Sequence, residues 1–178
     1  MIIARQKRKE NIVEYLIYMW QVEDLIRACH FDMDKIEECV ISQYEQPENI
    51  KQEIRGWFQE LIDMMRSEGV TENGHIQINK NVVAELTDLH LRLLKSPREN
   101  IYGTLYYKTL PAIAQLRSKS GGNDISELET CLTAVYGYLL LKMQGKEISS
   151  ETTESIKQIS SLLAFLAARF HEEEMPAQ

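Results

Sequence analysis

Three charged residues lie close together in an otherwise apolar stretch, "EYLIYMWQVEDLIRACH", which covers residues 14–30. Glu23 and Arg27 are four residues apart, with the acid nearer the N-terminus, so on a helix we predict that they form an ion pair. Asp24 has no partner four residues away on the same helix. We expect it to find a cation elsewhere, to reach solvent or to line a site.

Aromatic residues accompany these charges and supply further groups that bind ligands or partners. A buried tyrosine needs a hydrogen-bond partner for its hydroxyl. Tyrosines around a cleft could bind a planar or polar ligand, whereas tyrosines spread through the core only pack. We predict an interface or a pocket from these residues: Tyr18, Trp20, Glu23, Asp24, Arg27, Tyr102 and Tyr106.

Sequence patterns of catalytic and metal sites are absent. Di-metal helical bundles need Glu-x-x-His on a helix, and the chain has that spacing only at Glu72 and His75, across a predicted turn at Asn73-Gly74. No HExxH, GxxxxGK[ST], GxSxG or GxGxxG motif occurs. "SKSGGND", residues 118–124, lacks the lysine-serine pair that follows the glycines of a phosphate-binding loop and any strand before them, and we interpret it as a flexible connection. We therefore predict no catalytic residue, metal or cofactor.

Composition and charge restrict the class of protein. The chain has 178 residues, of which 44% are hydrophobic, and its net charge is −7. An acidic surface disfavours nucleic acid, because phosphate contacts need basic residues. The one basic run, "RQKRK" at residues 5–9, is a weak signal for a nucleic-acid contact and is typical of a solvated helix start.

Localisation is predicted to be cytoplasmic. No stretch approaches the roughly 18 apolar residues of a membrane span, and the first residues do not have the order of a signal peptide. The three cysteines, Cys29, Cys39 and Cys131, are an odd number without CxxC spacing, which indicates neither a disulfide framework nor a thiolate metal site.

The apolar spacing predicts one all-α domain over residues 1–178, a helical bundle of about six to seven helices. The first helix spans about 5–29, and the second starts at a capping box of Asp34 and Glu37 and ends near Tyr44. The others begin at about residue 47, where Gln46 caps and Pro47 is the first helical residue, at Lys80, at "SPRE" (96–99), at Asp124 and at "SSETTE" (149–154). Pro111 should kink or divide the fifth helix, and "HEEEMPAQ" (171–178) should fray.

Two further features shape the predicted bundle. Asn73-Gly74, flanked by β-prone residues, predicts a small β-hairpin over residues 70–78. One buried stripe is predicted on the third helix: Ile50, Ile54, Trp57, Phe58, Leu61, Ile62 and Met65.

The N-terminal stretch "MIIARQKRKENIVEYLIYMWQVEDLIRA", residues 1–28, together with "YGTLYY", resembles a bacterial all-helical family known as domain of unknown function number 4924. The resemblance extends over the full chain. It implies a cytoplasmic helical protein and assigns no activity, ligand or catalytic residue.

The first predicted helix is apolar around most of its circumference, with Val13, Leu16, Ile17 and Trp20 on a second face. Such a helix is buried in a bundle or shared with a partner. We therefore expect a non-enzymatic protein that acts through protein association, including self-association through this helix. The alternative is a small-molecule-binding protein or an unrecognised enzyme, with a tyrosine-lined pocket near Glu23, Asp24 and Arg27.

Overall fold

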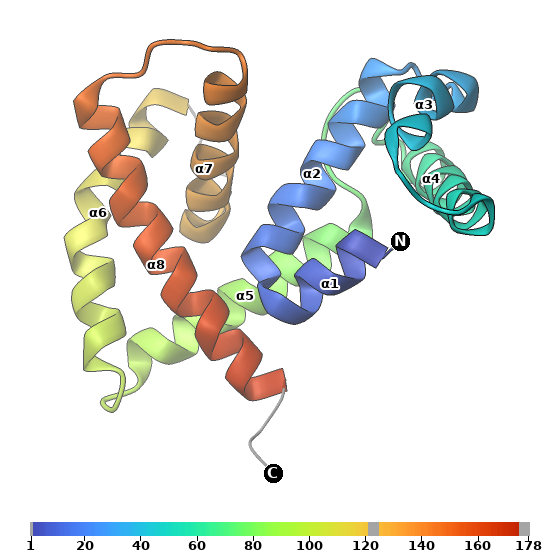
Figure 1. The fold of residues 1–178 in the computed structure, drawn as a ribbon. Helices are drawn as coiled ribbons and strands as arrows, with labels where there is room; N and C mark the ends of the chain where they lie inside the picture. The colour runs from blue at the N-terminus through green and yellow to red at the C-terminus, as the bar shows by residue number, and fades with distance from the viewer. Residues whose placement is uncertain (1, 121–124, 175–178) are drawn as a thin grey trace. The chain divides into compact units, whose positions relative to one another are not determined.

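The computed structural model describes residues 2–120 and 125–174, and in these residues all regular secondary structure is helical. The all-α prediction is therefore confirmed, but these residues form eight α-helices and one 3-10 helix rather than six or seven helices. The elements in chain order are α1 (Ile2–Glu10), α2 (Ile12–Ala28), α3 (Met33–Cys39), η1 (Ile41–Gln43), α4 (Glu48–Ser67), α5 (Gln77–Lys95), α6 (Asn100–Ser120), α7 (Glu127–Met143) and α8 (Ser150–Glu174) (Figure 1).

The helices divide into two compact units. Unit 1 comprises Met1–Glu10 and Glu14–Asn81, and unit 2 comprises Asn11–Val13 and Val82–Gln178. Each unit has its own apolar core, which includes Phe58 and Met65 in unit 1 and Leu132 and Leu166 in unit 2. That residues 1–178 form a single helical domain stays a prediction.

The first predicted helix is two helices, because Asn11 interrupts it. The Asn11 side-chain oxygen accepts the backbone N–H of Val13 at 3.0 Å, and Asn11 itself is not helical. Asparagine competes with the helix for backbone donors in this way and favours a new helix start. α2 therefore begins at Ile12 rather than near residue 5.

The starts of α3, α4 and α5 differ by one to three residues from the predicted ones, and α5 begins at Gln77 rather than at Lys80. The N-cap of α3 is Asp32, whose carboxylate accepts the backbone N–H groups of Asp34 and Lys35, so the predicted capping box at Asp34 is wrong. Pro47 is the N-cap of α4 rather than its first helical residue. Gly69 follows the helix with φ of +69°, a conformation that glycine adopts without strain, and the predicted end is confirmed.

The predicted β-hairpin at residues 70–78 is wrong, because residues 70–76 form a loop and Gln77 already begins α5. Gly74 has φ of +83°, so a tight turn does occur there. The backbone groups on either side of the turn are bonded to side chains of α2 rather than to a second strand. The carbonyls of Val70 and Gly74 and the N–H of Ile76 are therefore not available to a strand ladder.

In unit 2, α6, α7 and α8 pack against one another, with α6 beside α8 in Figure 1. α6 begins at Asn100, later than "SPRE" predicts, and continues through Pro111 without being divided. Its last turn includes residues 118–120 of the predicted "SKSGGND" loop, whereas residues 121–124, with the predicted cap Asp124, lie outside the described residues. Ser126 caps α7 by accepting the N–H of Glu129 at 3.0 Å.

The last helix extends further towards the C-terminus than the sequence predicts. α8 continues to Glu174, so the first four residues of the predicted frayed tail are helical, and residues 175–178 lie outside the described part of the chain. Within residues 2–120 and 125–174, no helix combines the length and the apolar character needed to cross a bilayer.

Candidate functional site

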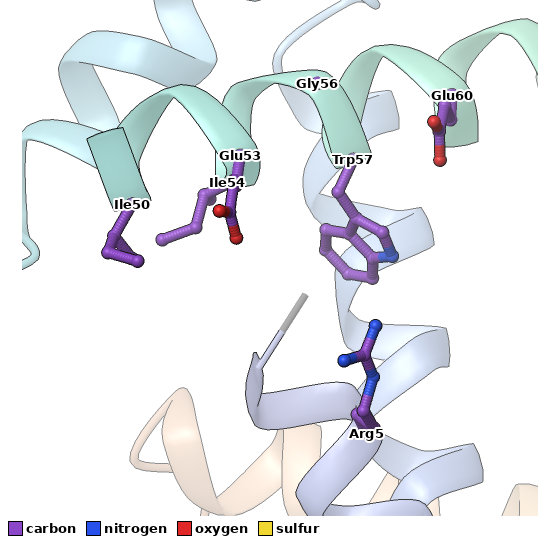
Figure 2. A pocket seen from close by; sticks show the side chains of 7 residues that line it. All are labelled: Arg5, Ile50, Glu53, Ile54, Gly56, Trp57 and Glu60. Atoms are coloured by element: carbon purple, nitrogen blue, oxygen red, sulfur yellow. The ribbon is translucent and has the colours of Figure 1, made fainter. Parts of the chain in front are cut away.

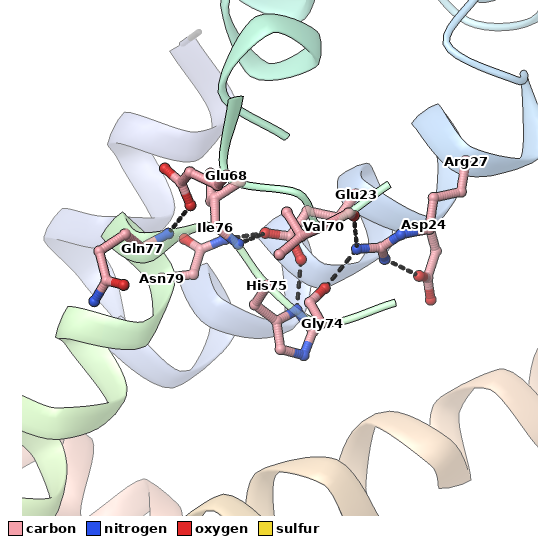
Figure 3. Close-up of polar contacts among 10 residues, drawn as sticks. All are labelled: Glu23, Asp24, Arg27, Glu68, Val70, Gly74, His75, Ile76, Gln77 and Asn79. Atoms are coloured by element: carbon pink, nitrogen blue, oxygen red, sulfur yellow. Dashed lines mark hydrogen bonds and ion pairs between the residues drawn. The ribbon is translucent and has the colours of Figure 1, made fainter. Parts of the chain in front are cut away.

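The carboxylate of Glu23 is fully buried and lies at the centre of a polar cluster in unit 1 (Figure 3). It accepts three hydrogen bonds, from His75 Nδ1 at 2.5 Å, from the backbone N–H of Ile76 at 3.1 Å and from Asn79 Nδ2 at 2.7 Å. A buried carboxylate is costly unless donors surround it, and three donors supply that requirement. Because all three lie more than 50 residues along the chain, Glu23 ties the loop before α5 to α2.

Trp20, one turn before Glu23, covers the histidine of this cluster. Its ring stacks on that of His75 with centroids 4.3 Å apart and planes 12° from parallel. Trp20 is almost fully buried, and the side chain of His75 is partly exposed. The stacking and the bond to Glu23 together fix the orientation of the imidazole.

Arg27 forms the second half of the cluster. Its guanidinium donates to Asp24 at 2.7 Å, to the carbonyl of Val70 at 3.0 Å and to the carbonyl of Gly74 at 2.5 Å. The predicted pairing of Glu23 with Arg27 is wrong, because His75, Asn79 and the N–H of Ile76 bond to Glu23, whereas Arg27 bonds to Asp24 and to the loop carbonyls. We expected Asp24 to have no partner on its own helix, and this is wrong, because Arg27 lies three residues away and forms an ion pair with it.

Burial distinguishes the two acids. The side chain of Asp24 is 46% exposed, whereas that of Glu23 is 0% exposed. Asp24 therefore makes a surface ion pair, and Glu23 makes a buried contact between segments. The cluster binds the loop of its own chain, and we assign it the role of holding residues 70–76 on α2.

The tyrosines predicted as site residues each have a partner. Tyr18 lies in unit 1, where burial and then the neighbouring Tyr44 raise its pKa. Tyr102 and Tyr106 lie in unit 2 on α6. The Tyr102 hydroxyl is 2.5 Å from Nδ1 of the buried His90, whose pKa is lowered by burial against an opposing effect of a nearby glutamate.

The hydroxyl of Tyr106 also has a hydrogen-bond partner within unit 2. Its hydroxyl donates to Glu127 at 2.6 Å, and burial followed by this bond raises the pKa of Tyr106 to about 12. Glu127 also lies 3.7 Å from Arg117. The structure thus assigns the hydroxyls of Tyr102 and Tyr106 to partners inside unit 2. That the seven predicted residues form an interface or pocket stays a prediction.

A pocket of about 450 Å³ opens between α1 and α4 in unit 1 (Figure 2). Trp57 and Ile50 are its half-buried apolar groups, and Arg5 points towards Trp57 from the opposite wall. The full lining is Arg5, Ile50, Glu53, Ile54, Gly56, Trp57 and Glu60. Glu53 and Glu60 project from the same face of α4 as Trp57.

The charged groups of this pocket are not engaged by the fold. Within the described residues, Arg5, Glu53 and Glu60 take part in no hydrogen bond or ion pair, and all three are exposed. By contrast, Arg55 and Arg66 of the same helix bond to α3 and to the residues just before it. A half-buried indole beside three uncommitted charges is available for contact with another molecule.

Sequence reasoning placed Trp57 and Ile50 in the buried stripe of α4, and this is wrong for both. The fully buried residues are Ile54, Phe58, Leu61, Ile62 and Met65. At 100° per residue, Trp57 lies about 60° to one side of Ile54, between that stripe and the two glutamates. A tryptophan at the edge of an apolar stripe, next to acids, is the signal that could have indicated the pocket.

The basic run of α1 is partly used within the chain. Lys7 pairs with Glu14 at 3.2 Å, and the Arg8 guanidinium lies 5.5 Å from the ring centroid of Tyr15. α1 begins at Ile2 and the basic run extends into its last turn, so the interpretation of the run as a helix start is wrong. Among residues 2–120 and 125–174, no three side chains of the His, Cys, Asp or Glu type are placed to hold a metal ion.

Comparison with known proteins identifies one family. The family described as a domain of unknown function (DUF4924) matches residues 1–176 of the chain. No curated protein and no solved structure shows a significant match.

Proposed function

Since the chain belongs to the DUF4924 family, a domain of unknown function, we propose its function from the geometry: it is a binding protein that associates with a partner protein through the Trp57 pocket. One observation carries the proposal. Trp57 is only half-buried, at a pocket where Arg5, Glu53 and Glu60 have no bonding partner among the described residues.

Tryptophan and arginine are the residues that contribute most binding energy at protein interfaces. Leaving an indole half in water forgoes part of the roughly 1.5–3 kcal/mol that full burial of a large apolar side chain contributes. A partner that covers Trp57 recovers this part of the burial free energy. The charges around the pocket then supply specificity, because potentials of opposite sign favour the right partner and repel others.

The second face of α2 supports self-association less well than the sequence indicates. Leu16 and Trp20 are buried and Ile17 is half-buried, so this face does not offer an exposed apolar surface. The pocket of α1 and α4 is the better candidate for an interface. A small-molecule ligand is the second candidate, because about 450 Å³ lies within the range of about 300–1,000 Å³ that ligand pockets span.

Site-specific crosslinking in cells tests the proposal. Gly56 lines the pocket, and a Cβ atom added there meets no atom within 4 Å, so we choose this position for a photo-crosslinking benzoylphenylalanine. Gly137 on α7 is also helical with open space around it, and it is the matched control. We expect a discrete crosslinked protein from position 56, its loss when Trp57→Ala is added, and no such product from position 137.

Two results would count against a partner at this pocket. One is the same set of products from both positions, and the other is a product from position 56 that persists undiminished in the Trp57→Ala background. Far-UV circular dichroism checks that Trp57→Ala remains folded, which we expect because Trp57 lies outside the buried stripe of α4.

A further inference from the structure

We infer that the partner segment is an amphipathic helix whose apolar stripe has acidic residues along one flank and basic residues along the other. This inference rests on the proposed function and adds the chemistry of the partner. It follows from the two walls of the pocket, which carry opposite charge.

The α4 wall is acidic. Glu53 and Glu60 are seven residues apart, which is about 10.5 Å along a helix, and Trp57 lies between them. The opposite wall, α1, is basic. It contributes Arg5 to the pocket, and Lys9 follows Arg5 by four residues on the same face, exposed and without a partner among the described residues.

The spacing favours a helix as the occupant. A helix lying along α4 repeats its own side chains every seven residues over the same length, as in the flanking charged positions of coiled coils. An extended strand repeats every two residues, about 6.6 Å, and its side chains would not remain in register with both glutamates. The pocket volume suits the side chains of such a stripe, which would cover Trp57 and Ile50.

The signs of the charges exclude two simpler partners. A wholly basic helix would be attracted by the net charge of −7 but would place cations against Arg5. A wholly acidic helix would meet Glu53 and Glu60. Like charges brought together at an interface act against binding, so a helix with one acidic and one basic flank fits both walls.

Three designed 18-residue helical peptides with one apolar stripe test the inference. The mixed peptide has glutamates on one flank and lysines on the other, the second has lysines on both, and the third has glutamates on both. Isothermal titration calorimetry with the full chain measures Kd at 150 mM salt. We expect the mixed peptide to bind at least about tenfold more tightly than the other two, and Trp57→Ala to weaken it at least about tenfold.

A change of one wall charge makes the test sharper. Arg5→Glu replaces the α1 cation that lines the pocket by an acid, and we expect it to reverse the preference towards the lysine peptide. Lys146→Glu, at an exposed lysine in unit 2, makes the same change in net charge and should leave the ranking of the peptides unchanged. Reversal in Arg5→Glu alone cannot come from net charge.

Other outcomes overturn the inference and separate it from the proposed function. A wild-type preference for the lysine peptide that Arg5→Glu does not alter indicates binding by net charge only. If position 56 gives a crosslinked protein but no peptide binds, then the proposed function stands and the inference of a helical partner segment is wrong. Self-association that Trp57→Ala abolishes, seen by sedimentation, assigns the pocket to a second copy of the chain.

Discussion

Replacement of Glu23 measures how strongly the polar cluster holds the loop before α5 on α2. In Glu23→Ala, Asn79 Nδ2, the Ile76 N–H and His75 lose their acceptor in a site that is fully buried at Glu23. Each hydrogen bond to a charged group contributes about 1.5–3 kcal/mol, and contributions within one network do not add fully. We expect Glu23→Ala to lower the free energy of unfolding by about 5 kcal/mol.

Glu23→Gln separates charge from shape. The amide oxygen can still accept from Ile76 and Asn79, and the amide N–H can donate to His75 once that ring carries its proton on the other nitrogen. The variant loses only the additional strength that hydrogen bonds to a charged acceptor have over neutral ones. We therefore expect the free energy of unfolding to fall by about 2 kcal/mol. Asp24→Asn is the neighbouring control. Its ion pair is half-exposed, and we expect a loss under about 1 kcal/mol.

The chain carries its own probe for this measurement. Its two tryptophans, Trp20 and Trp57, both lie in unit 1, so fluorescence during urea unfolding reports on the unit that contains Glu23. Far-UV circular dichroism follows all helices, and coincidence of the two curves would support a single cooperative domain. If Glu23→Ala and Asp24→Asn differ by less than about 1 kcal/mol, then the carboxylate of Glu23 reaches water and the cluster does not hold the loop.

Three further changes have definite expected results. Arg27→Ala leaves the carbonyls of Val70 and Gly74 without their donor, and urea unfolding should show a loss of about 3 kcal/mol. His30, in the turn after α2, has φ of +57°, so His30→Gly should raise the melting temperature through a gain of about 0.5–1 kcal/mol, whereas Ala28→Gly at the last residue of α2 should lower it. Burial lowers the pKa of His90 in the folded state, so below its unfolded value of about 6.5 the unfolded chain binds more protons. Stability should therefore fall as pH drops from 7 towards the folded pKa, and His90→Gln should show a smaller fall over the same range.

Much of the fold follows from local sequence. The apolar periodicity of α4, α7 and α8 indicates each helix, because most of their stability comes from one face that packs on neighbours. Asn11 was not recognised as a break, since a single asparagine within a strongly apolar pattern is compatible with a helix interior. Only the bond from its side chain to the N–H of Val13 shows that it starts a new helix.

The loop at residues 70–76 shows where local signals fail. Asn73-Gly74 does turn the chain, as its sequence predicts, but a hairpin also needs two strands whose backbone groups pair. Here Glu23 and Arg27 take those groups from about 45–55 residues away in the sequence. The spacing rules for helix pairs concern residues three or four apart, so they predict a bond between Glu23 and Arg27 and cannot detect a more distant competitor.

The charged residues of the cluster and those of the pocket differ in whether they have bonding partners within the described part of the chain. Glu23 and Arg27, conspicuous in an apolar helix, are engaged by backbone and side chains of their own unit, and removing them should destabilise it. Glu53, Glu60 and Arg5, inconspicuous in charged stretches, have no partner among the described residues, and their removal should leave the fold unchanged. Loss of binding without loss of stability is the signature of a functional residue, so substitutions at the pocket test function and substitutions at the cluster test folding.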